Sequence, residues 1–244
     1  MRIAFIHDWE PDYNQELTWR DGLSRAVQIL GERNQLKFFT LGQEQTVLPH
    51  PFFDIHVMPS SEALRESVAA FFPDVILHWA DMTRPNAKSL FSLGKPQAIC
   101  YAGGNTQAGN DVFFDHIFVE SKVYKEAFTR MGQSVSTAFG TNTELFKPIP
   151  EMAKHFDVFF PATYCDWKRH KLFAEATDGL KACTAGFMYQ VQERYCYEYP
   201  RSKGVLTLPH VDANTLRFLY AGSKCVVITS RADGGSQRTV LEAM

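Results

Sequence analysis

The sequence predicts an α/β protein with two Rossmann-like domains, each a doubly wound parallel sheet, of which the second is incomplete. Three observations lead to this prediction. Apolar runs of strand length alternate with amphipathic helical segments along the 244 residues, a pattern typical of parallel strands joined by right-handed helical crossovers. The alternation starts near Arg2 and begins again near Lys154. The composition, with 45% hydrophobic residues, is that of a globular chain large enough for two small domains.

The first domain opens with a strand at residues 2–6, followed by a loop and a helix that begins at Gly22 and ends near Gly31. Ser60 or Ser61 is placed to cap a later helix. We expect the remaining strands at residues 36–40, 54–58, 74–79, 97–101, 116–120 and 134–138, and the remaining helices at 60–71, from Pro85, and at 121–131.

The second domain opens with a strand at residues 156–160. Its last predicted strand, at 225–229, is a continuous apolar run, which fits a strand buried on both faces of a parallel sheet. A helix with an apolar stripe of Val240, Leu241 and Met244 follows. Further strands are expected at 180–185 and 204–208, and further helices after the loop 163–168, within the aromatic-rich stretch 189–200, and after the cap residue Asp212.

The end of the sequence predicts an incomplete second sheet. Only four strands are expected there, and the chain stops within its last helix without a C-terminal cap. We therefore expect a chain that is cut short, with apolar strand and helix surface left exposed. Low activity, or a need for a partner, would follow.

A glycine-rich loop at 230–235 separates the last strand from the last helix. Backbone N–H groups at such a turn carry partial positive charge, and glycines allow an anion to approach the main chain closely, so a phosphate would fit. An ordinary strand-to-helix turn remains the alternative. On the helix itself, Arg238 and Glu242 lie four residues apart, a spacing that also suits a simple surface ion pair.

The segment 230–244 resembles the donor-binding segment of the large nucleotide-sugar glycosyltransferase family called group 1 or family 4, in which a glycine loop precedes a helix carrying Glu-Ala-Met. The resemblance implies that Glu242 hydrogen-bonds hydroxyls of the donor's ribose or sugar. It also implies that the loop binds the donor and its diphosphate through Gly234, Gly235, Ser236, Gln237 and Arg238. One departure is that Gly234 stands where the family usually has a second acidic residue.

A second, independent resemblance covers 121–148. The family ends its first domain with a helix, a Gly, a strand, a Gly-x-Asp turn and Phe-x-Pro, and here the turn is Gly140-Thr141-Asn142 and the last motif ends at Pro148. Asn142 replaces Asp, and both residues make the same side-chain-to-backbone turn bonds. This order of parts predicts domains at 1–148 and 149–244. The alternative is that any helix-to-strand connection carries such residues.

Further donor-binding residues follow from the same resemblance. Thr163 is implied as a donor contact in the loop after the first strand of this domain. The family holds the diphosphate with an Arg in that loop and with Lys-Gly at the start of the next helix. Lys168 matches the Lys, Arg169 stands where Gly is usual, and no Arg occurs at 161–163. A solvated helix end is the alternative for both cations. His210 is implied as a contact of the nucleotide base, although a lone loop His is more often a surface residue.

The resemblance implies a GT-B fold, with the active cleft between the carboxyl ends of two facing sheets and the acceptor on the first domain. Acceptor contacts would come from Gly22, Asp81, Gly104 and Asn105. A dedicated general base is optional for this chemistry, and His78 is the best candidate if one exists. The family transfers sugar from a nucleoside-diphosphate-sugar, usually with retention of configuration, and needs no metal or other cofactor. The acceptor would be a glycan, a lipid-linked sugar or a small molecule, in polysaccharide or glycoconjugate synthesis.

Composition limits the partners. The net charge of −2 argues against a nucleic-acid partner, which needs a basic stripe. No apolar run approaches the roughly 20 residues that span a bilayer, and no signal peptide is recognisable, so we expect a cytoplasmic protein and leave a peripheral membrane contact open. The five cysteines are expected to be reduced and mostly buried. Two other functions stay open, a non-catalytic nucleotide-sugar-binding module and a nucleotide-sugar epimerase or phosphorylase of the same architecture.

Overall fold

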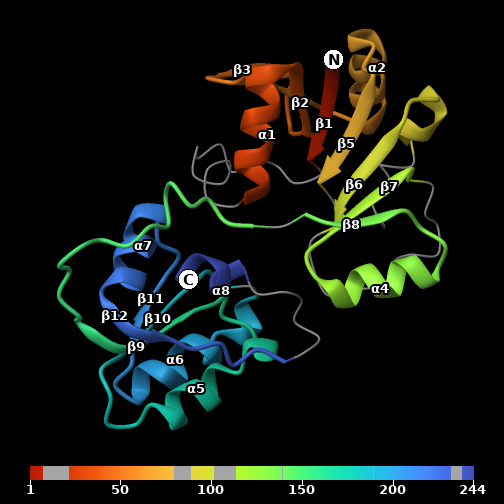
Figure 1. The fold of residues 1–244 in the computed structure, drawn as a ribbon. Coiled ribbons are helices and arrows are strands. Elements are labelled where there is room, and N and C mark those ends of the chain that lie inside the picture. The colour runs from red at the N-terminus through yellow and green to blue at the C-terminus, as the bar shows by residue number, and fades with distance from the viewer. Residues whose placement is uncertain (8–21, 80–88, 102–113, 139, 189, 232–237) are drawn as a thin grey trace. The chain divides into compact units, whose positions relative to one another are not determined.

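The computed structural model describes residues 1–7, 22–79, 89–101, 114–138, 140–188, 190–231 and 238–244. The chain divides into two compact units, Met1–Phe139 and Gly140–Met244. Each unit contains one sheet with helices packed on it (Figure 1).

The first unit is built on an eight-stranded sheet with the order β3-β4-β2-β1-β5-β6-β7-β8. Neighbouring strands are parallel except for the pair β3 and β4. The strands are β1 (Arg2–His7), β2 (Gln35–Leu41), β3 (Thr46–His50), β4 (Phe53–Met58), β5 (Val75–Trp79), β6 (Gln97–Tyr101), β7 (His116–Val119) and β8 (Val135–Thr137). The helices are α1 (Gly22–Arg33), α2 (Ser61–Phe71), the short 3-10 turn η1 (Phe91–Leu93) and α4 (Lys122–Arg130).

Two details of this unit differ from the sequence prediction. Strand β3 was not expected; it pairs antiparallel with β4 at the edge of the sheet, the position where a strand tolerates Pro49. Helix α1 does not end at Gly31 but continues to Arg33. A Cβ at Gly31 would lie 2.6 Å from the main-chain oxygen of Phe52, so this glycine allows close packing inside the helix rather than ending it.

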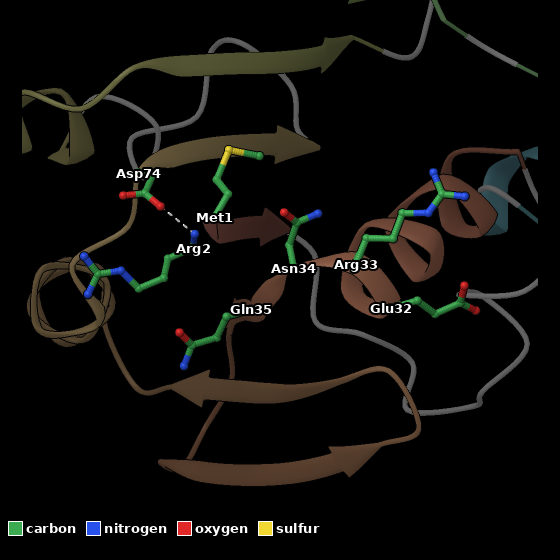
Figure 2. A pocket seen from close by; sticks show the side chains of 7 residues that line it. All are labelled: Met1, Arg2, Glu32, Arg33, Asn34, Gln35 and Asp74. Carbon is green, nitrogen blue, oxygen red and sulfur yellow. Dashed lines mark hydrogen bonds between the residues drawn. The ribbon is translucent and has the colours of Figure 1, made fainter.

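A hollow of about 610 Å³ lies beside the amino end of β1 and is lined by Met1, Arg2, Glu32, Arg33, Asn34, Gln35 and Asp74 (Figure 2). The main-chain nitrogen of Arg2 donates a 2.6 Å hydrogen bond to Asp74 Oδ2, and this bond holds the pKa of Asp74 below its usual value. Ligands of doubly wound sheets bind at the opposite end of the strands, the carboxyl end. We therefore do not place the functional site in this hollow.

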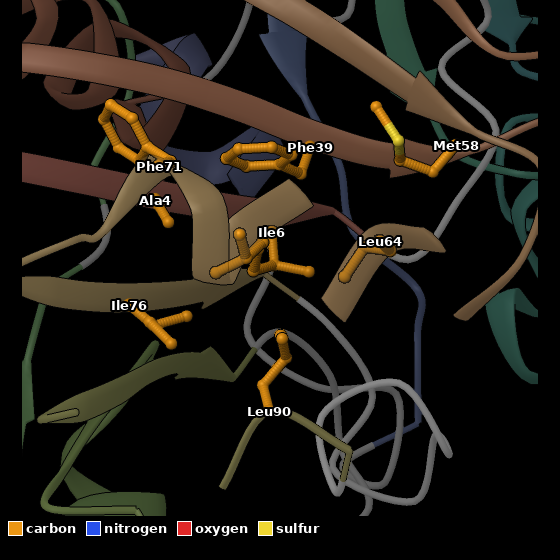
Figure 3. Close-up of a cluster of buried hydrophobic side chains, with 9 residues drawn as sticks. Ala4, Ile6, Phe39, Met58, Leu64, Phe71, Ile76 and Leu90 are labelled. Atoms are coloured by element: carbon orange, nitrogen blue, oxygen red, sulfur yellow. The ribbon is translucent and has the colours of Figure 1, made fainter. Parts of the chain in front are cut away.

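One core of the first unit lies between the sheet and α2. It contains Ala4, Ile6, Phe39, Met58, Leu64, Val68, Phe71, Ile76 and Leu90 (Figure 3). Full burial of a large side chain of this kind stabilises the fold by roughly 1.5 to 3 kcal/mol. The predicted cap of α2 is confirmed, because Ser60 Oγ accepts a 3.1 Å hydrogen bond from the nitrogen of Ala63.

The second unit is built on a four-stranded parallel sheet with the order β11-β10-β9-β12. Its strands are β9 (Phe156–Pro161), β10 (Ala182–Ala185), β11 (Leu206–Leu208) and β12 (Ser223–Val226). The other elements are the 3-10 turns η3 (Asp166–Lys168) and η4 (Val191–Glu193) and the helices α5 (His170–Ala176), α6 (Tyr195–Ser202), α7 (Ala213–Ala221) and α8 (Arg238–Ala243).

Two predicted turns and caps of this unit are present. Asp212 Oδ1 accepts a 2.7 Å hydrogen bond from the nitrogen of Thr215, which caps α7. Asn142 Oδ1 accepts a 3.1 Å hydrogen bond from the nitrogen of Glu144, the turn bond expected of an Asp at this position.

The last two elements are packed differently from the prediction. Strand β12 lies at the edge of its sheet, and Cys225 is exposed there, whereas the other four cysteines are buried. On α8 the apolar stripe is wrong as a buried face, because Val240, Leu241 and Met244 are exposed and Glu242 is buried. No helix in the described part of the chain is both long and apolar enough to cross a membrane.

Candidate functional site

The carboxyl ends of β9 and β12 define the candidate site of the second unit. The sheet is built outward from β9 in both directions, with β10 and β11 on one side and β12 on the other. Loops that leave neighbouring strands in opposite directions open a crevice between them, and ligands of open α/β sheets bind in it. Here those loops are residues 162–169, after β9, and residues 227–231, after β12.

Hydrogen bonds to main-chain oxygens join these two loops. Thr229 Oγ1 donates to the oxygen of Lys168 at 2.7 Å, and the nitrogen of Arg231 donates to the oxygen of Trp167 at 3.0 Å. In the other direction, Arg169 Nε donates to the oxygen of Thr229, and Arg169 Nη2 donates to the oxygen of Ser230 at 3.3 Å. We call these bonds the loop clasp. They fix Lys168 at the point where the two loops meet.

Arg169 takes part in the clasp in a strained conformation. Its φ of 56° and ψ of 49° lie in the left-handed region, which costs a non-glycine residue about 1 to 2 kcal/mol. This conformation explains why a glycine suits the position. In this chain the guanidinium instead donates to two carbonyl oxygens, so Arg169 joins the loops.

His170 is a residue of the site that sequence reasoning missed. It is 1% exposed, and its Nε2 donates a 2.9 Å hydrogen bond to the main-chain oxygen of Thr163. Burial lowers the pKa of the imidazole to about 4, so the ring is neutral at pH 7. His170 therefore holds Thr163, a predicted donor contact, through its main chain. A polar residue at the start of an amphipathic helix gives no sequence signal for such a role.

Asp166 links the clasp to α6. Its carboxylate accepts a 2.7 Å hydrogen bond from the hydroxyl of Tyr195 and lies 3.4 Å from Arg231 Nη2. The bond to Asp166 raises the pKa of Tyr195. Both members of the ion pair are more than half exposed, with 53% and 59% of their side chains accessible, so the pair adds little stability. These contacts span up to 65 residues of sequence, and no local pattern predicts them.

Glu242 is buried, at 7% exposure. Its Oε2 accepts a 2.7 Å hydrogen bond from the hydroxyl of Tyr220 on α7. The ring of Tyr220 packs edge-on against Phe146 and Phe159, with centroid distances of 5.7 and 5.3 Å. Because Glu242 is buried, it is not half of a surface ion pair, which was the alternative left open by its spacing from Arg238.

The other predicted donor contacts are placed only in part. His210 is exposed in the loop that follows β11, at the same edge of the sheet as the clasp. Arg238 is the first residue of α8. Gly234, Gly235, Ser236 and Gln237 lie outside the described residues.

In the first unit, His78 lies within β5, inside the strand expected at 74–79, and its side chain is buried. It is 0% exposed, its Nε2 lies 2.7 Å from Gln97 Oε1, and its ring packs edge-on against Phe114. Burial lowers its pKa to about 4. The predicted role of general base is not supported, because an imidazole with no accessible surface does not reach a substrate in this structure.

The structure describes only one of the four predicted acceptor contacts. Gly22 is the first residue of α1, whereas Asp81, Gly104 and Asn105 lie outside the described residues.

No protein-family model and no curated protein sequence matches the chain. Solved structures do match. Sucrose-phosphate synthase from Thermosynechococcus elongatus has a TM-score of 0.75 and 14% identity, over 100% of this chain and 78% of that one. α,α-Trehalose 6-phosphate synthase from Burkholderia multivorans has a TM-score of 0.71 and 11% identity, over 99% and 80%. The pneumococcal O-GlcNAc transferase GtfA, solved with UDP and GlcNAc, has a TM-score of 0.55 and 12% identity, over 83% and 46%.

The sucrose-phosphate synthase and the trehalose 6-phosphate synthase are GT-B glycosyltransferases. At identities of 11 to 14% the similarity establishes architecture. It confirms the fold class predicted from the alternation of strands and helices: the chain has the fold of a GT-B glycosyltransferase.

Proposed function

We propose that the protein is a glycosyltransferase that moves a sugar from a nucleoside-diphosphate-sugar to an acceptor, with retention of configuration and without a metal ion. The observation that carries the proposal is the loop clasp, which holds Lys168 at the switch point of the second sheet, against the segment that leads into the glycine-rich loop. The similar enzyme GtfA was solved in complex with UDP and GlcNAc. A donor of the same class suits a GT-B fold with a cation at this place.

The chemistry explains why a cation is needed there. As the bond between sugar and diphosphate breaks, negative charge develops on the leaving phosphate oxygen. A fixed positive charge near that oxygen stabilises the transition state more than the ground state. Lys168 is the residue to which we assign this role. The clasp holds its main chain, so the flexible side chain extends from a fixed Cα position.

The remaining assignments extend this proposal. Glu242 would accept hydrogen bonds from hydroxyls of the donor, with its carboxylate oriented by Tyr220. The glycine-rich loop would contact the diphosphate, and the first domain would bind a glycan, lipid-linked or small-molecule acceptor. We propose a cytoplasmic site of action, where nucleotide-sugars are made. No side-chain general base is assigned, because His78 is buried.

A thermal-shift screen with UDP, GDP and ADP and their common sugar derivatives tests the proposal. A ligand that binds only the native state raises the melting temperature, and we expect one nucleoside diphosphate and its sugar to do so. Incubation of that donor with candidate acceptors should then release the nucleoside diphosphate and form a glycoside. Binding without release would instead favour a non-catalytic module, and conversion of the donor to its epimer would favour an epimerase.

A further inference from the structure

Among the described residues, β8 is the last strand of its sheet, and no strand pairs with its outer edge. The main-chain oxygen of Ser134 accepts a 2.9 Å hydrogen bond from the nitrogen of Ile117, and the nitrogen of Ala138 donates to the oxygen of Val119 at 3.1 Å. Peptide groups of successive residues in a strand point to alternate sides. The N–H and C=O groups of Val135 and Thr137 therefore point away from β7, and no main-chain hydrogen bond joins them to the rest of the described chain.

A basic groove runs beside this open edge. It has a volume of about 600 Å³ and is lined by Lys122, Lys125, Glu126, Thr129, Arg130 and Thr137. Three of these residues are cations and one is an anion, and the anion lies 4.0 Å from Arg130. Figure 1 shows α4, which carries the cations, alongside the β8 end of the sheet. Thr137 belongs to both the edge and the groove, so the two are continuous.

We propose that this surface binds an extended acidic peptide segment by strand addition. The segment's main chain would pair with the outward N–H and C=O groups of Val135 and Thr137. Side chains of an added strand alternate between the two faces of the sheet. Every second side chain of the segment therefore faces α4, and acidic residues at those positions meet Lys122 and Lys125. The recognised sequence alternates acidic and uncharged residues.

Other occupants fit this surface less well. A second copy of the chain would bring a second set of the same α4 cations to one seam, where like charges repel. A nucleic acid offers phosphate oxygens to the cations, but its backbone offers no regular donors to the C=O groups of Val135 and Thr137. An extended peptide supplies donors, acceptors and carboxylates in one ligand.

The test uses a fluorescein-labelled, end-capped peptide of four Glu-Thr repeats and the whole chain, with binding followed by fluorescence anisotropy. Thr137→Pro removes an outward N–H and leaves the β7–β8 ladder intact, since prolines are tolerated where a strand's N–H faces outward. Thr137→Val keeps that N–H and is the matched control. We expect Thr137→Pro to weaken binding by about tenfold and Thr137→Val to change it less than about twofold. Lys122→Glu combined with Lys125→Glu should also weaken it by about tenfold.

Hydrogen exchange gives an independent readout that does not depend on a variant folding. The peptide should slow exchange of the amides of Val135 and Thr137, while the inward amide of Ser136 should stay unchanged. Several results overturn the proposal: no binding of the acidic peptide by the wild-type chain, equal binding of a Lys-Thr peptide, or unchanged exchange at Val135 and Thr137. Self-association lost in Thr137→Pro would assign the edge to a second copy instead. Binding of an oligothymidylate that depends on Lys122 and Lys125 would assign the groove to nucleic acid.

Discussion

The hydroxyl of Tyr220 donates a 2.7 Å hydrogen bond to Glu242 Oε2, and this bond joins α7 to α8. Because Glu242 is buried, removal of the hydroxyl takes one hydrogen-bond donor away from a buried carboxylate. We predict that Tyr220→Phe lowers the free energy of unfolding by about 1 to 3 kcal/mol. Urea denaturation of the wild type and the variant measures the difference. Tyr199→Phe, which removes an exposed bond to Glu175, is the control and should have little effect. Equal loss in both variants would contradict a special role for the buried bond.

Glu242→Gln separates donor binding from folding. Gln keeps an oxygen that accepts the bond from Tyr220 but lacks the charge that strengthens bonds to sugar hydroxyls. We predict a loss of donor affinity of about 1 to 3 kcal/mol, with a smaller change in stability than in Tyr220→Phe. Isothermal titration with the best donor from the screen, together with unliganded melting temperatures, measures both quantities. Unchanged affinity would remove Glu242 from the donor site.

Lys168→Ala tests the cation held by the loop clasp. We predict that it weakens binding of the nucleoside diphosphate by about 1.5 to 3 kcal/mol, the range for a hydrogen bond to a charged group. Lys171→Ala is the matched control. Lys171 lies three residues further along, its side chain is 66% exposed, and it pairs with Glu175 at 3.8 Å. Its replacement should therefore weaken binding of the nucleoside diphosphate by less than about 0.5 kcal/mol. Calorimetry that finds the same loss in both variants would point to general charge rather than to a site.

Arg169 offers a test of backbone strain. Both Arg169→Gly and Arg169→Ala remove the two bonds from the guanidinium to the carbonyls of Thr229 and Ser230. Only glycine also removes the strain of the left-handed conformation, although glycine loses more conformational entropy on folding. We predict that the glycine variant is more stable than the alanine variant by about 0.5 to 1 kcal/mol. Thermal denaturation compares them, and a more stable alanine variant would show that the left-handed conformation is not retained in solution.

The lowered pKa of His170 should make the free energy of unfolding depend on pH. Burial lowers its pKa in the folded state to about 4, below the value of about 6.5 in the unfolded chain. Below pH 6.5 the unfolded state therefore binds a proton that the folded state does not, and stability falls with pH until about pH 4. Between pH 6.5 and 5 we expect this residue to account for a loss of about 1.5 kcal/mol in the free energy of unfolding. His170→Gln should show a shallower decline in urea denaturation series, and parallel curves would contradict the assignment.

Much of the fold followed from local pattern. Runs such as residues 97–101 form central strands because their apolar side chains are buried on both faces, and burial is what an apolar run records. Strand β3 was missed for the same reason, since Thr46 and Val47 are exposed and an edge strand needs no apolar run.

The site was less predictable, because its contacts join residues far apart in sequence. Tyr220 and Glu242 are 22 residues apart, and Thr229 and Lys168 are 61 apart. The burial of His78 shows a second reason why the site could not be predicted from the sequence. Its hydrogen bond to Gln97 pairs one of the two ring nitrogens of an imidazole inside an otherwise apolar strand, and one sequence does not reveal whether such a histidine faces the core or a ligand.

The loop clasp has a thermodynamic consequence for any ligand that binds beside it. Holding a residue in one conformation costs about 1 to 2 kcal/mol of entropy, and a flexible loop would incur that cost each time a ligand arrives. Residues 166–169 and 229–231 are tied together by the folded chain itself, so their ordering belongs to the free energy of folding. Association at this point is then preorganised. Mutations that open the clasp should appear first as weaker binding with an unfavourable entropy, before any group that touches the ligand has been changed.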